Sequence, residues 1–281
     1  MVRSLWTGAT GMNAQQTNVD TIANNMANVN SVGYKAQGAQ FKTLLYQTLQ
    51  SPSTTANGNP KPTDSEVGLG VRVASINNFF KQGALLANDS NTAVAIQGEG
   101  LFGYHNESGE IRYTRNGDFT WALGNADGSE LVFTTADGNP VLDTQGREIR
   151  TSNFNLTGDG QVIANKIGIS KSGEFTYPDA DDVPQPTGVT IGLWQFNNFG
   201  GMERVGQSSF AETEASGPAL NEATNQNLRR STFAPGYLEG SGVDVATEMV
   251  NMIVAQRAYE MNSRTITTTD SMMQTANELK R

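Results

Sequence analysis

Apolar side chains recur every seven residues at both ends of the chain, and this pattern constrains the fold more than any other feature. A seven-residue spacing places side chains on one stripe of an α-helix. In residues 4–29 the stripe is formed by Leu5, Met12, Val19 and Met26. After Asp244, which is suited to cap a helix, it is formed by Val245, Met252, Tyr259, Ile266 and Met273. Both stripes need cover, so we expect the terminal helices to pack as an antiparallel, coiled-coil-like pair.

The second row of each expected seam is less apolar than the first. In the first helix it comprises Val2, Ala9, Gln16 and Ala23, and in the last helix Met249, Gln256, Ser263, Asp270 and Asn277. Polar residues in a seam fix the register of a coiled coil and reduce its stability. Ser4 is suited to cap the first helix.

Two glycines and a further apolar stripe indicate that these helices need partners. Gly8 and Gly11 each destabilise a helix interior by about 1 kcal/mol relative to Ala, and they permit close approach of a neighbouring backbone. A further stripe on the C-terminal helix is formed by Val250, Ile253, Val254 and Met261. We therefore expect the ends to gain order by packing against other copies of the chain. Docking of the ends on their own middle domain is the alternative.

The middle of the chain has the pattern of an antiparallel β domain. Short β-type runs alternate with Asn-Gly and Asp-Gly pairs, including Asn116-Gly117 and Asp137-Gly138, and no helical period intervenes. The expected strands are 71–76, 94–96, 101–104, 111–113, 119–121, 131–133, 162–163, 167–169, 175–177 and 189–196. The predicted fold class is α+β. Its parts are a terminal helical domain (1–30 and 244–281), an extended connecting region (31–70) and the β domain with its return segment (71–243).

Composition limits the classes of function. The net charge is −9, and because residues 1–50 carry +2 and residues 236–281 carry −2, all of it resides in residues 51–235. Nucleic-acid binding needs a basic surface, so this acidic middle argues against it. No apolar run approaches the roughly 20 residues that span a bilayer, and the first residues lack the apolar core of a cleaved signal peptide. The chain has no Cys, which excludes disulfides and thiol chemistry.

Motifs that could carry enzymatic chemistry have simpler structural explanations. Residues 98–103 satisfy G-x-G-x-x-G, but a strand and turn follow where dinucleotide binding requires a helix, so we expect a β-hairpin. His105 is the only histidine, and we expect it in an exposed turn. The acidic run Asp179–Asp182 lacks the Gly and final Glu of an EF-hand and is expected to be a solvated loop. We predict no catalytic residue, no cofactor and no metal.

The ends and the middle together resemble a known family. Ala23-Asn24-Asn25-Met26-Ala27-Asn28-Val29, followed by Gly33-Tyr34-Lys35, closely resembles the signature of flagellar basal-body rod and hook proteins. The family pattern more often has Leu at position 26 and Phe at position 34. Segments 68–71 and 118–119 resemble the family's β domain, and 249–253 and 256–260 resemble its C-terminal helix. Arg3-Ser4-Leu5-Trp6 and Leu44-Leu45-Tyr46-Gln47-Thr48 resemble distal-rod members in particular. The resemblance covers essentially the whole chain in order.

The resemblance implies a structural subunit of the distal rod, which self-assembles into a helical tube that transmits torque from motor to hook. It implies export through the flagellar type III apparatus without a cleaved signal peptide, and a place in the basal body, where the rod crosses the periplasm. The implied partners are further copies of the chain, other rod and hook subunits, and the surrounding ring proteins, with no nucleic acid and no embedding in the membrane.

The expected subunit interface lies on the terminal helices. Its residues are Leu5, Met12, Val19, Asn24, Asn25, Met26, Asn28, Val245, Met249, Met252, Ile253, Tyr259, Ile266 and Met273. The resemblance also places a segment that makes the rod rigid at 47–66, with Gln47, Pro52, Pro60 and Pro62 as its marked residues. The alternatives are a short hook-type or proximal rod subunit, an enzyme acting on peptidoglycan through its β domain, and a surface adhesin.

Overall fold

The computed structural model describes residues 2–50, 65–124, 130–155, 162–179, 183–206, 208–225 and 227–279. Its internal contacts divide the chain into two compact units. The helical unit comprises residues 1–27, 37–77 and 244–281, and the β unit comprises residues 28–36 and 78–243. Two terminal helices and many antiparallel strands confirm the predicted α+β class.

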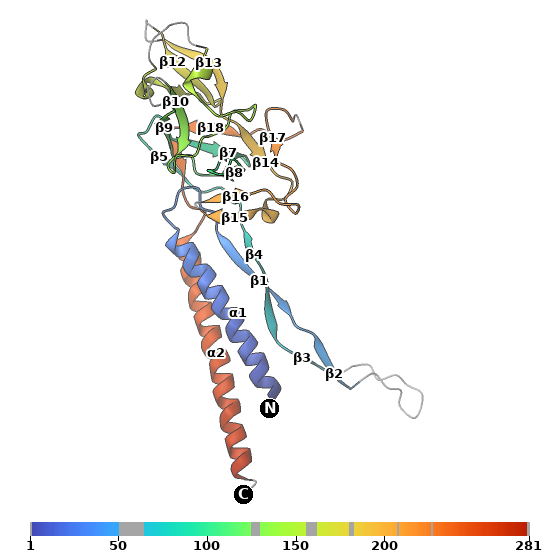
Figure 1. Cartoon of the computed structure of the whole chain (residues 1–281). Coiled ribbons are helices and arrows are strands. Elements are labelled where there is room, and N and C mark those ends of the chain that lie inside the picture. The colour runs from blue at the N-terminus through green and yellow to red at the C-terminus, as the bar shows by residue number, and fades with distance from the viewer. Residues whose placement is uncertain are drawn as a thin grey trace. The chain divides into compact units, whose positions relative to one another are not determined.

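The helical unit is built on two long helices, α1 (Val2–Ala27) and α2 (Val245–Glu278). Figure 1 shows them side by side in opposite directions, with both chain ends at the same end of the pair. Asp244 caps α2, as predicted, because its carboxylate accepts hydrogen bonds from the Ala246 N–H (3.2 Å) and the Thr247 hydroxyl (2.6 Å). The prediction for Ser4 is wrong, because α1 already begins at Val2 and Ser4 lies inside it.

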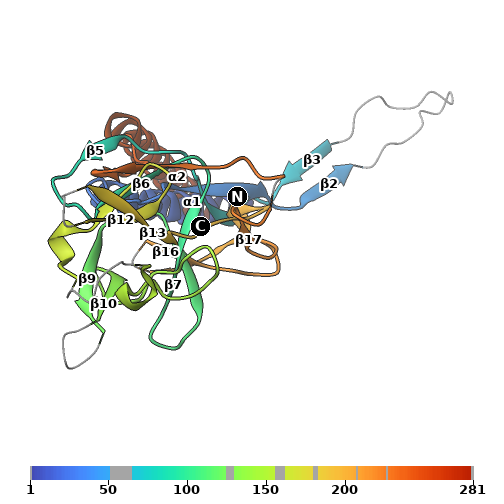
Figure 2. The same cartoon turned by 90° about the horizontal axis from the view of Figure 1, so that it is seen from above.

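Two strand pairs complete the helical unit. β1 (Gln37–Thr43) pairs with β4 (Val71–Asn78), and β2 (Tyr46–Gln50) pairs with β3 (Ser65–Gly68) in antiparallel register. Figure 2 shows β2 and β3 side by side. The chain thus runs out along β1 and β2 and returns along β3 and β4. Sequence patterns predicted most of β4 but gave no sign of β1, β2 or β3, whose side chains are mostly exposed.

The β unit is organised around a six-stranded sheet. Its order is β15 (Glu203–Gly206), β16 (Ser209–Ala211), β8 (Ile111–Thr114), β7 (Leu101–His105), β14 (Leu193–Gln195) and β17 (Leu220–Asn221). Smaller antiparallel groups are β9 (Phe119–Leu123) with β10 (Leu131–Thr135), β11 (Gly168–Ile169) with β12 (Glu174–Pro178) and β13 (Pro184–Thr190), β18 (Thr232–Pro235) with β6 (Val94–Gln97), and β19 (Tyr237–Glu239) with β5 (Leu85–Ala87). Three short 3-10 helices are η1 (Thr151–Asn153), η2 (Ala164–Lys166) and η3 (Phe199–Gly201).

Alternation along the strands gives the β unit two apolar clusters. Successive residues of β7 point to opposite faces of the sheet, so Leu101 enters one cluster and Phe102 the other. The larger cluster contains Phe102, Phe119, Phe133 and Phe175, whose rings pack edge-on or tilted. These aromatic contacts hold the small sheets onto the central one.

Two predicted strands differ from the structure. Residues 162–163 are not a strand, because η2 follows directly and Ile163 is exposed. Residues 189–196 are not one strand but the end of β13 and all of β14. The break falls at Gly192, where a Cβ would lie 2.5 Å from the Asp143 carbonyl oxygen. Close approach of another backbone, which the sequence pattern does not reveal, therefore divides the run.

Candidate assembly surface and buried ion cluster

Small residues bring α1 and α2 into close contact. The Ser4 and Thr269 hydroxyl oxygens lie 3.2 Å apart. A Cβ at Gly8 would lie 2.9 Å from the Ile266 side chain, and one at Gly11 would lie 2.8 Å from the Asn262 amide nitrogen. Both glycines therefore leave room for side chains of α2, whereas the sequence analysis expected a neighbouring backbone at these positions.

Asn25 ties the other end of the helix pair together. It is fully buried, its side chain donates to the Gln37 carbonyl (2.7 Å), and its Oδ1 accepts from the Gln37 N–H (2.9 Å). It also donates to the Glu248 carboxylate at 3.4 Å. Burial raises the pKa of Glu248, the Asn25 hydrogen bond lowers it, and the Asp244 charge raises it, with a net increase. The Asn25 side chain is thus occupied by contacts within the subunit.

The row of α1 that faces α2 is offset by one residue from the expected seam. Ser4, Gly11 and Asn25 lie in the contact, whereas Leu5, Met12, Val19 and Met26 lie beside it and are half-buried. The small side chains occupy the contact because they leave room for side chains of α2, and the larger apolar ones flank it. Leucine and methionine spacing alone could not distinguish a contact row from its flank.

Only part of the seam expected on α2 is covered by the rest of the chain. Met252, Ile266 and Met273 are half-buried, whereas Tyr259 and Val245 of the same row are exposed. The second row is formed by Ala255, Asn262 and Thr269 and not by the row that starts at Met249, which is itself exposed. Of the remaining predicted interface residues, Asn24 is exposed and Asn28 is half-buried and accepts from the Ser31 hydroxyl.

An apolar stripe on α2 is exposed in the single chain. It comprises Val250, Ile253, Val254 and Met261, and the exposed fractions of Val254 and Met261 reach 61% and 69%. A groove of about 430 Å³ runs along this side of the helix. Its walls are Ile253, Gln256, Arg257, Glu260, Met261 and Arg264. Covering apolar surface yields about 25 cal/mol per Å², so a partner on this stripe would stabilise the helix.

The outer strands of the helical unit also expose apolar side chains. Leu45 precedes β2, Tyr46 and Leu49 lie on it, and all three are exposed, as is Gln47. The other marked residues of the predicted rigid segment, Pro52, Pro60 and Pro62, lie outside the described residues. Exposed apolar groups in this number are typical of surfaces that bind other proteins.

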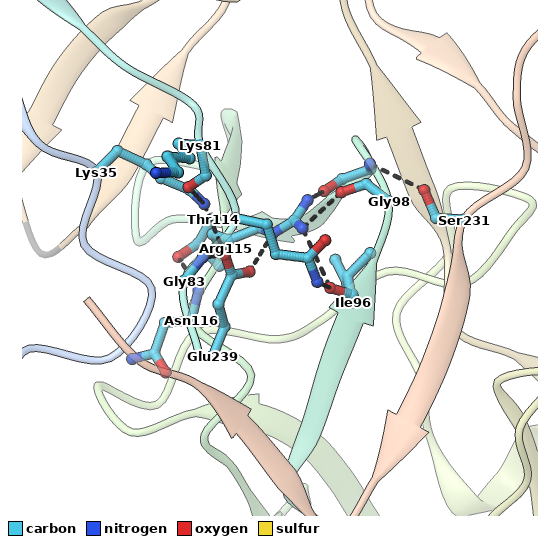
Figure 3. Close-up of polar contacts among 12 residues, drawn as sticks. Lys35, Lys81, Gly83, Ile96, Gly98, Thr114, Arg115, Asn116, Ser231 and Glu239 are labelled. Carbon is cyan, nitrogen blue, oxygen red and sulfur yellow. Dashed lines mark hydrogen bonds and ion pairs between the residues drawn. The ribbon is translucent and has the colours of Figure 1, made fainter. Parts of the chain in front are cut away.

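Three charged side chains meet in the interior of the β unit (Figure 3). The exposed fractions of the Lys35, Arg115 and Glu239 side chains are 2%, 3% and 0%. The Lys35 ammonium lies 2.7 Å from Glu239 Oε1, and Arg115 Nε lies 2.5 Å from Oε2. The Arg115 guanidinium also donates to the carbonyls of Ile96, Gly98 and Gly100. We call these three side chains the ion cluster.

The ion cluster shifts the pKa of two of its members. Burial raises the pKa of Glu239, but the Arg115 and Lys35 charges outweigh burial and hold it below its ordinary value. Burial lowers the pKa of Lys35, the Glu239 charge raises it, and the Arg115 charge lowers it further. Both pKa shifts follow from one arrangement, in which two cations share one carboxylate. The carboxylate gains two favourable neighbours, whereas Lys35 gains one favourable and one unfavourable neighbour.

Sequence patterns did not reveal the ion cluster. Lys35 belongs to the Gly33-Tyr34-Lys35 motif, and no local pattern marks Arg115 or Glu239. The only sequence signal was position: Lys35 lies in the short segment between α1 and β1, and Glu239 ends β19, the last strand before α2. Charged residues are rarely fully buried unless paired, and pairing between positions so distant in sequence is not visible in a local pattern.

The motifs considered for enzymatic or metal-binding chemistry occupy the following places in the fold. Residues 98–103 lead directly into β7, which pairs with β8 in the predicted hairpin. His105 is not in an exposed turn, because it ends β7 opposite Ile111 and is half-buried. Residues 180–182 of the acidic run lie outside the described part. Within the described ranges, no three Asp, Glu or His side chains are grouped to hold a metal ion, and no helix is both long and apolar enough to cross a membrane.

Three protein families match successive parts of the chain. The family described as flagella basal body rod protein matches residues 5–35. The D1 domain of flagellar hook protein FlgE/F/G matches residues 95–177. The C-terminal part of the flagellar basal body rod FlgEFG proteins matches residues 234–279. These matches cover α1, a large part of the β unit and α2.

Full-length relatives are flagellar basal-body rod proteins named FlgG. The relative from Borreliella burgdorferi is 39% identical over 284 residues and covers 100% of both chains. That from Caulobacter vibrioides is 39% identical over 285 residues, covering 99% of this chain and all of the relative. That from Agrobacterium fabrum is 38% identical over 276 residues, covering 96% and 97%.

Proposed function

Because the chain belongs to the flagellar basal-body rod protein family, we propose that it is a structural subunit of the distal rod that self-assembles into a helical, torque-transmitting tube. Full-length similarity to FlgG proteins is the observation that carries this proposal. The exposed stripe of α2 supports it, because a surface of this kind gains stability when another subunit covers it. Repeated use of one such surface generates an open helical polymer.

The predicted interface residues divide into two roles in this proposal. Asn25 and Ile266 hold α1 and α2 together within one subunit, and we assign the half-buried Met252 and Met273 to the same role. Exposed side chains make contacts between subunits; these are Asn24, Val245, Met249, Ile253 and Tyr259. Leu5, Met12, Val19 and Met26, half-buried beside the helix contact, complete the surface offered to a neighbour.

The partners follow from the same assembly. Other rod and hook subunits adjoin this one in the basal body, and we propose that ring proteins surround the rod and that the flagellar type III apparatus exports the subunit. The proposal assigns the chain no catalytic residue, cofactor or metal. An enzyme acting on peptidoglycan would instead release fragments from purified cell wall, and single carboxylate substitutions would abolish that release.

Electron microscopy of concentrated protein tests the proposal. We expect helical tubes from the full-length chain and monomers only from a version lacking residues 1–30 and 244–281. Compact monomers from both, with protease-resistant ends in the full-length chain, would contradict self-assembly through the ends. If the full-length chain extends only pre-formed rod fragments, the ends still drive assembly, and the same truncation must abolish that extension.

A further inference from the structure

Four short stretches of chain connect the β unit to the helical unit. The chain passes between the units after residues 27, 36, 77 and 243. Lys35 precedes the second passage by one residue, Lys81 follows the third, and Glu239 precedes the fourth. Two members of the ion cluster therefore lie on connecting segments, within the β unit and close to the points where the chain leaves it.

The cluster joins these segments to one another by direct hydrogen bonds. Besides its contact with Glu239, the Lys35 ammonium donates to the Lys81 carbonyl at 2.9 Å. Glu239 Oε1 also accepts from the Gly83 N–H at 2.8 Å. The Glu239 carbonyl accepts from the Gly33 N–H at 2.8 Å. One carboxylate residue thus binds both of the other segments.

Backbone contacts surround the cluster on the same three segments. The Gly242 N–H donates to the Tyr34 carbonyl at 2.9 Å, and the Phe79 N–H donates to the Ala36 carbonyl at 2.8 Å. The chains approach so closely that a Cβ at Gly83 would lie 2.1 Å from the Gly240 carbonyl oxygen. Gly33 adopts φ +67°, and a Cβ there would lie 2.7 Å from the Arg115 backbone.

The buried charges of the ion cluster fix the positions of the segments around them more than they stabilise the fold. Removing two or three ions from water is costly, and apolar residues of similar volume often stabilise a fold as well or better. A buried carboxylate, however, requires donors at defined positions, and losing one donor leaves a charge unsatisfied. Segments that share such a carboxylate therefore become ordered together.

We propose that the ion cluster is a joint that locks segments 33–36, 79–84 and 239–242 into one element, so that they order and yield together. Arg115 anchors this element to the central sheet region through its contacts with the carbonyls of residues 96, 98 and 100. The mechanical consequence rests on the proposed function: in a rod under torque, any force that these covalent connections carry into the β unit reaches the joint. The joint itself is a property of the single chain.

Amide hydrogen exchange on the full-length chain tests the joint. Lys35→Met is the main variant, because it removes one cation and leaves the Arg115–Glu239 pair intact. We expect the amides of Gly33, Gly83 and Gly242 to exchange at least about tenfold faster, while core amides of β7 and β10 stay within about twofold. Glu239→Gln should accelerate the same three amides more strongly.

Asp143→Asn is the matched control. Asp143 is another buried, ion-paired carboxylate of the β unit, but its partner Arg147 is local and it contacts none of the three segments. Its amide variant should leave Gly33, Gly83 and Gly242 unchanged. The joint is refuted if Lys35→Met leaves those amides unchanged, or if the core amides accelerate in parallel with them. The failure of tubes to form would refute the proposed function and leave this result standing.

Discussion

Single residues in this protein set how closely its parts approach. Gly11 and Gly8 occupy the contact between α1 and α2, where larger residues would meet Asn262 and Ile266. In the β unit, Glu239 is completely buried and takes its stability from two cations. In both places one side chain, or its absence, determines a contact between segments that are far apart in the chain: Glu239 lies 204 positions from Lys35 and 124 from Arg115.

The pairing of α1 with α2 predicts an intramolecular disulfide. The chain has no cysteine of its own, and Ser4 and Thr269 are in direct contact, so Ser4→Cys with Thr269→Cys should cross-link within one molecule on oxidation. Adding Gly11→Leu should slow this cross-linking by roughly tenfold, because overpacking costs about 1–3 kcal/mol. Non-reducing electrophoresis measures both. Ser271 is exposed, so Ser4→Cys with Ser271→Cys is the control, and dimer bands in place of the intramolecular product would contradict the pairing.

The ion cluster predicts that the β unit loses stability in acid. The folded-state pKa of Glu239 lies below its ordinary value of about 4.3, so the unfolded chain binds its proton more readily. The contribution of ionised Glu239 to the free energy of unfolding is fully present above that ordinary pKa. It is lost as the pH falls through the lowered folded-state pKa. Urea unfolding at a series of pH values, followed by fluorescence of Trp121 and Trp194, measures the effect. Glu239→Gln should be less stable at pH 7 and should lack this part of the pH dependence, and parallel curves for the two proteins would contradict the assignment.

Among the elements, α2 has two sides with different tasks. One side packs against α1 through Ala255, Asn262 and Thr269, and the other presents Val250, Ile253, Val254 and Met261 to solvent. A helix with one side packed inside the subunit and an apolar stripe on another gains stability in a polymer, where both are covered. The heptad pattern predicted that α2 would be a long helix, and the further stripe singled out in the sequence is the side that the structure leaves exposed. The pattern did not identify Ala255, Asn262 and Thr269 as the row that packs within the subunit.

A charge on the exposed stripe of α2 is expected to prevent assembly while sparing the helix pair. Ile253→Lys should reduce polymer yield at least tenfold. Burial of an apolar side chain of this size stabilises an interface by about 2 kcal/mol, and this gain is lost. The unpaired lysine ammonium is in addition costly to bury. Sedimentation of polymer measures the yield, and the Ser4–Thr269 cross-link verifies the helix pair. Thr267→Lys, an exposed site on the same helix, should assemble normally. Equal loss in both variants would mean that charge on α2, and not the stripe, limits assembly.

At the scale of the whole molecule, the chain forms two compact units. Residues from both ends and from 37–77 form the helical unit, and the rest forms a β unit with its own aromatic core. From the resemblance to distal-rod proteins we propose that segment 47–66, which begins on β2 and ends on β3, makes the rod rigid. Its central residues lie outside the described part, so its role is tested by deletion.

Deleting residues 47–66 should soften or curve the polymer without preventing its formation. We expect a persistence length well below that of the full-length polymer, because the strands that extend the helical unit are lost, and electron micrographs of filament curvature measure it. Replacing residues 51–64 with an equally long Gly/Ser segment separates the effect of sequence from that of length. Filaments as straight as those of the full-length chain would favour a short hook-type or proximal rod subunit and assign rigidity elsewhere.

The sequence by itself determined the elements whose signals are local. The heptads of Leu5–Met26 and Val245–Met273 predicted two long helices, and Asp244 marked the start of α2. In the central sheet, β-type runs predicted β7, β8 and the residues of β14, but they missed β15, β16 and β17. Tertiary structure alone decided which row of α1 faces α2, because that choice depends on the space that Gly8 and Gly11 leave for the Ile266 and Asn262 side chains. It also decided the burial of Lys35, Arg115 and Glu239, because a buried charge is tolerated only where distant partners meet it. Periodicity reports the face of one element, whereas contact rows and ion clusters arise from several elements that only the folded chain brings together.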